Sequence, residues 1–291
     1  MVDRNDIDNI QPVPAPRRTG ICFDSEMVAL GGSLIADGAN RILKLDPVWG
    51  PLRKDSALPS ADRQIFDEWL RQGLACDMKR AYALSIPQTL EEVCDPHRVA
   101  LLVYDMQVGI LSQLKNPEQI TGQVLKVLSA ARDAGVRVFF SRHLSLAKEL
   151  MGMFQYRMAM AWQRTDSPEQ VNPWFLRESP SFQIIPELAP QPSEGIFDKL
   201  TMSALEGTWL DFALRDCGIN AFIIVGVAME IGVEPTARHG ADLGYIPVIV
   251  ADACGAGNED AAKRSIESLK FAGDVIITDT ESLCQVLKQQ G

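Results

Sequence analysis

The sequence contains few of the features that indicate a metal centre, a disulfide framework or a membrane protein. It has three histidines and six cysteines in 291 residues, and the cysteines are scattered without a CxxC pair. This spacing excludes the common structural zinc sites, and we expect reduced thiols. The apolar runs, such as AFIIVGVAM, are too short to cross a bilayer, and the first residues lack the apolar core of a secretory signal. We therefore expect a soluble, cytoplasmic protein.

Positive charge is also scarce. The chain has 28 Lys and Arg against 38 Asp and Glu, a formal net charge of −10. Nucleic acids and anionic membranes select for clustered basic residues, so neither is expected as a partner. The expected ligand is a small molecule.

The chain divides into an irregular and a regular part. Residues 1–95 are expected to be an N-terminal extension, with an extended, mobile arm over 1–20, which contains PVPAPRR, and a helix over 61–75, where apolar residues recur at helical spacing. Residues 96–291 are expected to form the main domain.

The regular part alternates apolar runs with amphipathic segments. Continuous apolar runs of this kind are typical of parallel strands that are buried on both faces. The sequence therefore predicts a three-layer α/β/α fold with a doubly wound, six-stranded, mainly parallel sheet. The expected strands cover 98–105, 136–143, 194–199, 220–227, 246–253 and 274–280, and the expected helices 117–135, 146–164, 203–218, 230–244, 258–273 and 280–290.

Polar residues stand where the predicted strands end, which is where ligands bind in such sheets. Asp105 ends the first strand, Arg142 and His143 the second, and Lys199 the third. An acid and a lysine that converge from separate strands are typical of a catalytic site, although an aspartate there can equally cap the following helix.

Three segments in order, VALLVYDMQ, FDKLTMSALEGTWLDFALRDCGI and VGVAMEIGVEPTARHGADLGYIPVIVADA, resemble the isochorismatase-like hydrolase superfamily. The resemblance covers about residues 98–291 and implies a triad of Asp, Lys and Cys. Asp105 then corresponds to the acid/base and Lys199 to its cationic partner. The position of the cysteine is occupied by Gly232, as it is by glycine in the isochorismatase branch, whose members cleave a vinyl ether without a covalent intermediate.

The missing thiol excludes an acyl-enzyme route through residue 232. Glycine would leave the backbone N–H groups of this turn open to water or substrate. The family also implies a cis peptide bond between Val227 and Ala228, which would direct the Ala228 amide into the pocket. Two functions stay open: a hydrolase for a small anionic or amide-bearing molecule that uses Asp105 and Lys199 without a nucleophile, and a catalytically inactive protein that binds a ligand or partner in the inherited pocket.

Other residues are weaker candidates. Glu230 complements the dipole of the helix that it opens or orients a water. Arg142 binds a substrate carboxylate or a structural acid, and Cys254 is expected to fill the core rather than to act as a nucleophile. A capping box of Ser203 and Glu206 is expected to begin a helix. The further candidates for substrate binding, beside Glu230 and Arg142, are Gln107, His143, Tyr156, Arg157 and Trp162.

The nicotinamidase metal site needs an aspartate and two histidines, whereas the segment around His143 supplies one histidine. We therefore expect no metal and no cofactor. The methionine-rich segment 151–162 is expected to lie in the core, at a subunit interface or along the pocket, and the family implies a homo-oligomer, either a dimer or a tetramer.

Overall fold

The computed structural model describes residues 79–290. Strands β1 (Lys79–Ala81) and β2 (Leu84–Ile86) form an antiparallel hairpin that belongs to a separate unit. The second compact unit begins at Pro87, ahead of the expected boundary at 95/96, and Val93 and Cys94 are already part of its core. The expected arm over 1–20 and the expected helix over 61–75 lie outside the described residues.

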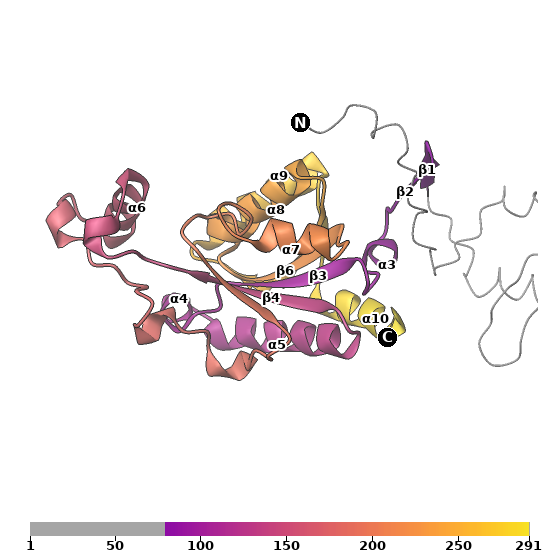
Figure 1. Ribbon diagram of the computed structural model, residues 1–291, viewed down its shortest axis with the longest axis horizontal. Coiled ribbons are helices and arrows are strands. Elements are labelled where there is room, and N and C mark those ends of the chain that lie inside the picture. Colours follow the sequence, from indigo (N-terminus) through magenta and orange to yellow (C-terminus); the bar gives the residue numbers. More distant parts are fainter. Residues whose placement is uncertain (1–78, 291) are drawn as a thin grey trace, which may run out of the picture. The chain divides into compact units, whose positions relative to one another are not determined.

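A six-stranded sheet in the order β5-β4-β3-β6-β7-β8 forms the centre of this unit, and its strands pair in parallel (Figure 1). The chain enters at β3, adds β4 and β5 on one side, and returns to add β6, β7 and β8 on the other. The order therefore reverses between β3 and β6, which is where ligands bind in doubly wound sheets. The strands are β3 (Val99–Tyr104), β4 (Arg137–His143), β5 (Gly195–Lys199), β6 (Ala221–Val227), β7 (Ile246–Gly255) and β8 (Ile276–Thr278).

Helices cover both faces of the sheet, as Figure 1 shows. Alternate residues of the buried strands point to opposite faces and build two apolar layers. One layer packs against α5 (Pro117–Asp133) and α10 (Thr280–Gln290), and the other against α7 (Leu210–Asp216), α8 (Glu234–Asp242) and α9 (Glu259–Ala272). The predicted three-layer α/β fold is thus confirmed.

Short helical segments connect these elements. The α-helices are α3 (Leu90–Val93), α4 (Val108–Leu111) and α6 (Met153–Gln163). The 3-10 turns are η2 (Lys148–Leu150), η3 (Pro168–Gln170), η4 (Pro180–Phe182) and η5 (Pro186–Leu188), and η6 (Met229–Val233) is a π-helix.

Three predicted helices differ from the structure. The helix expected over 146–164 is divided into η2 and α6, with extended backbone at Gly152. The helix expected over 203–218 begins only at Leu210, so the expected capping box is wrong: Ser203 Oγ instead accepts the Leu205 N–H and bonds to His239. The segment before Glu234 is a π-turn rather than regular helix.

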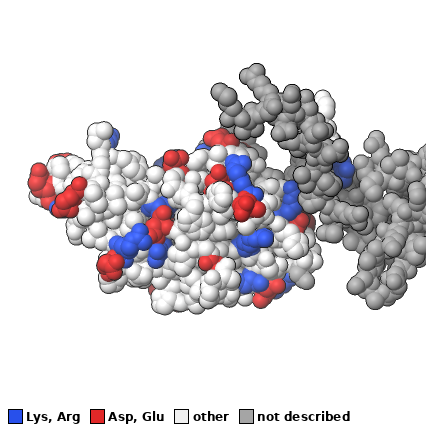
Figure 2. All heavy atoms as spheres, in the orientation of Figure 1, with Lys and Arg blue, Asp and Glu red and all other residues white. Residues whose placement is uncertain are grey.

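Charges of both signs are mixed on the face shown in Figure 2, and the lobe that carries α6 is largely uncharged apart from acidic residues near its tip. Across residues 79–290, no helix combines the length and the apolar character needed to span a membrane.

Candidate active site

The expected acid and lysine form an ion pair at the carboxyl edge of the sheet. Asp105 directly follows β3 with a φ of 48°, a left-handed conformation that aspartate tolerates better than most residues. Lys199 ends β5, two strands away. Its Nζ lies 2.7 Å from Asp105 Oδ2, and the two side chains are 1% and 5% exposed. Burial lowers the pKa of Lys199, and the carboxylate of Asp105 opposes this shift.

Ser141, on the intervening strand β4, completes the surroundings of the carboxylate. Its Oγ donates to Asp105 Oδ1 at 2.6 Å and accepts the Asp105 N–H at 3.2 Å. Lys199 Nζ also donates to Thr201 O at 3.2 Å and lies 4.4 Å from the centre of the Tyr104 ring. These contacts fix the carboxylate between a hydroxyl and an ammonium group, which is a suitable arrangement for proton transfer.

Gly232 lies beneath the ring of Tyr104. A Cβ built on Gly232 would overlap the hydroxyl and ring carbons of Tyr104. The Tyr104 hydroxyl donates to Met202 O, and burial raises the pKa of Tyr104 well above its usual range. The space expected to be bare over Gly232 is therefore filled, and a side chain at 232 is incompatible with the ring in this position.

The backbone of this turn is also bonded internally. The expected cis peptide between Val227 and Ala228 is present. The Gly232 N–H, however, donates to Ala228 O at 3.0 Å, and Gly232 O accepts from Thr236 Oγ1 at 2.7 Å. The expectation that glycine leaves this amide open to water is thus wrong, because the π-turn caps it.

Gln107 links three segments near the site. Its Nε2 donates to His143 O at 3.1 Å and Phe182 O at 2.8 Å, and its Oε1 accepts the His143 N–H at 2.6 Å. The side chain is fully buried. These contacts give Gln107, which the sequence proposes for substrate binding, a structural role at the ends of β3 and β4.

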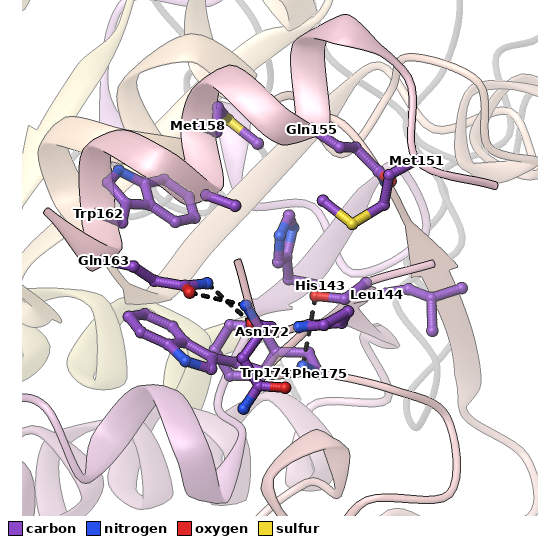
Figure 3. Close-up of a pocket in the computed structure, with 13 residues that line it drawn as sticks. His143, Leu144, Met151, Gln155, Met158, Trp162, Gln163, Asn172, Trp174 and Phe175 are labelled. Atoms are coloured by element: carbon purple, nitrogen blue, oxygen red, sulfur yellow. Dashed lines mark hydrogen bonds between the residues drawn. The ribbon is translucent and has the colours of Figure 1, made fainter. Parts of the chain in front are cut away.

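Arg142 and His143 point into different surroundings, as neighbours in a strand do. Arg142 forms an ion pair with Asp198 at 2.7 Å, so the alternative of a structural acid fits the structure. His143 lies beside a cavity bounded by α6 and residues 172–175 (Figure 3). Burial, with Lys199 nearby, lowers the pKa of His143 to about 4.

The remaining candidates are only partly brought together. Trp162 lines the cavity, and its ring centre lies 6.1 Å from that of His143. Tyr156 donates to Lys148 O at 3.1 Å, and Arg157 is exposed on α6. Glu230 Oε1 accepts the Asn258 N–H at 2.6 Å, whereas Glu230 Oε2 is buried without a partner among the described residues.

Four residues of this region were missed by sequence reasoning: Tyr104, Ser141, Gln155 and Thr236. Ser141 carried a signal, because it is a polar residue within the apolar run VRVFFS. Tyr104 carried none, since an aromatic residue is ordinary in a buried strand. Cys254 is buried, and burial raises the pKa of its thiol to about 12, as a packing role requires. Within residues 79–290, no cluster of three or more His, Cys, Asp or Glu side chains could hold a metal ion.

Comparison with known proteins identifies the family. The model of the isochorismatase domain matches residues 99–282. The chain belongs to the isochorismatase family of hydrolases. It is 27% identical over 223 residues to the ureidoacrylate amidohydrolase RutB of Serratia proteamaculans (strain 568), an alignment that covers 70% of this chain and 89% of that protein.

Solved structures of isochorismatase-like hydrolases share the fold. A cysteine hydrolase from Pseudomonas syringae pv. phaseolicola superimposes with a TM-score of 0.59 at 26% identity, over 72% of this chain and 100% of that one. The N-carbamoylsarcosine amidase from Thermoplasma acidophilum gives a TM-score of 0.52 at 19% identity, over 63% of this chain and 96% of that one. This second likeness concerns the fold alone.

Proposed function

We propose that this member of the isochorismatase family hydrolyses a small organic substrate, at a C–N amide or vinyl ether bond, by acid/base chemistry without a covalent intermediate. The observation that carries this proposal is the buried pair of Asp105 and Lys199, 2.7 Å apart, beside a position 232 that has no thiol. The similarity to an amidohydrolase supports the C–N bond as the target.

In this mechanism, Asp105 accepts a proton from the attacking water and returns it to the leaving group. Lys199 keeps the carboxylate ionised and stabilises negative charge that develops on the substrate. The ring of Tyr104 closes the side of Gly232. Water and substrate therefore approach from the side of His143, where the cavity lies.

Turnover of purified protein against amides, carbamoyl compounds and vinyl ethers tests this function. The matched control is Asp105→Asn, which keeps the size of the side chain but cannot accept a proton. General acid/base catalysis contributes about 10²–10⁴-fold, so the variant is expected to lose at least about a hundredfold of kcat. Equal turnover by both proteins would refute the mechanism.

The second candidate is a protein that binds a ligand in the family pocket without turning it over. Tyr104 favours it, because the ring fills the place where the family implies a nucleophile, and so does the burial of both charged side chains. Under this function the wild type turns over none of the compounds. Asp105→Asn would then leave ligand binding largely intact.

A further inference from the structure

A small cavity adjoins the acid and lysine across His143. It encloses about 40 Å³ between α6 and residues 172–175 (Figure 3). Its apolar walls come from Met151, Met158, Trp162 and Trp174. The ring centres of His143 and Phe175, two further lining residues, are 5.7 Å apart with planes at 78°. Aromatic side chains arranged edge to face provide flat surfaces, which favour a flat ligand.

The cavity has no charged wall. None of the described residues that line it is Asp, Glu, Lys or Arg. Its one titratable ring, His143, is neutral at pH 7, because burial lowers its pKa to about 4. The neighbouring Arg142 is engaged by Asp198. A carboxylate placed here would lose its hydration without gaining a counter-charge, so an uncharged ligand is favoured.

The cavity does contain polar groups that lack partners. Gln155 Oε1 is buried and accepts no hydrogen bond from the described residues. Ser145 Oγ accepts the Phe175 N–H at 3.3 Å, which leaves its own hydrogen available to donate. An unpaired buried acceptor costs about 1–3 kcal/mol, which a ligand N–H at Gln155 would offset. One acceptor and one donor are what an amide group requires of its binding site.

We propose that this cavity is the specificity pocket and that it selects an uncharged, planar ring bearing an amide N–H, which donates to Gln155 Oε1. The inference rests on the proposed function in one respect: it takes the bound molecule to be the substrate that reaches Asp105 and Lys199 past His143. It also narrows the expectation from sequence, since the anionic class of substrate has no partner here.

Calorimetric titration of the full chain tests the pocket with three probes of similar shape. Benzamide is neutral and donates an N–H, N,N-dimethylbenzamide is neutral without a donor, and benzoate is charged. The Asp105→Asn background prevents hydrolysis during the titration. Benzamide is expected to bind about tenfold more tightly than either of the other probes, as the loss of one buried hydrogen bond implies.

Gln155→Leu removes the acceptor while nearly keeping the volume, and it is expected to weaken benzamide binding by about tenfold and to leave N,N-dimethylbenzamide binding unchanged. The control is Gln119→Leu, the same change at an exposed position of α5, which is expected to alter nothing. Circular dichroism confirms that each variant is folded. Equal binding of benzoate, no detectable binding of benzamide, or an unchanged benzamide affinity in Gln155→Leu would each overturn the pocket assignment.

The two proposals fail separately. If benzamide binds as expected but the wild type turns over no compound, the pocket assignment stands and the hydrolase does not. If the wild type hydrolyses an anionic amide with a rate that Gln155→Leu leaves unchanged, the hydrolase stands and the pocket assignment is overturned.

Discussion

The polar groups beyond β3 and those beyond β4 are arranged in opposite ways. Asp105 and Lys199 are bonded to one another, and Ser141 and Thr201 take up further bonds of the pair. In the cavity beyond β4, by contrast, Gln155 Oε1 is buried without a partner among the described residues. Groups that perform chemistry gain from being fixed before the substrate arrives, whereas groups that recognise a ligand keep their hydrogen bonds for it.

The largest effect should follow from breaking the pair beyond β3. Lys199→Met leaves the buried carboxylate of Asp105 without its counter-charge, and we expect a loss of about 3–5 kcal/mol in the free energy of unfolding, measured in urea. Lys263→Met, at an exposed position of α9, is the control. A loss below about 1 kcal/mol, as for exposed ion pairs, would contradict the pairing.

The pH dependence of stability should show how dry the cavity side is. Because burial lowers the pKa of His143 to about 4, the unfolded chain binds this proton at a higher pH than the folded chain. The contribution of the neutral ring is therefore complete above about pH 6.5 and is lost as the pH falls toward 4, by on the order of 3 kcal/mol in total.

The measurement is urea denaturation of the wild type and His143→Phe between pH 4 and pH 7. The variant lacks this titration, so its stability relative to the wild type should increase as the pH falls. Parallel curves for the two proteins would show that His143 is hydrated and protonates normally.

The contact between Tyr104 and Gly232 can be measured by a double-mutant cycle. Gly232→Cys should cost about 1–3 kcal/mol, because the new side chain overlaps the ring. Combination with Tyr104→Val should relieve the overlap and give a coupling energy above about 1 kcal/mol. Gly122→Cys, where the new side chain meets no atom within 4 Å, serves as the control. Additive effects would place the ring elsewhere.

The smallest effect is expected from thiol alkylation. Iodoacetamide should label exposed Cys217 but not buried Cys254, whose pKa burial raises to about 12. Turnover should be unchanged, because no step uses sulfur. Peptide mass mapping measures the labelling, and a loss of activity in parallel with modification of Cys254 would identify that thiol as the nucleophile.

The sequence carries much of this fold because apolar periodicity and strand-end residues are local signals. The six strands and the partnership of Asp105 with Lys199 follow from them and from the family resemblance. The contact of Tyr104 with Gly232 does not, since it joins residues of two strand ends through packing that no pattern records. The cavity was likewise beyond reach, because residues 172–175 lie in an irregular segment whose course is set by tertiary contacts.

The most direct test compares kcat/KM of the wild type with that of Asp105→Asn on the best substrate of the panel, with both proteins shown to be folded. The account predicts measurable hydrolysis by the wild type and a loss of about 10²–10⁴-fold in the variant. Hydrolysis by the variant within twofold of the wild type, or no hydrolysis by the wild type of any amide, carbamoyl compound or vinyl ether, would contradict it.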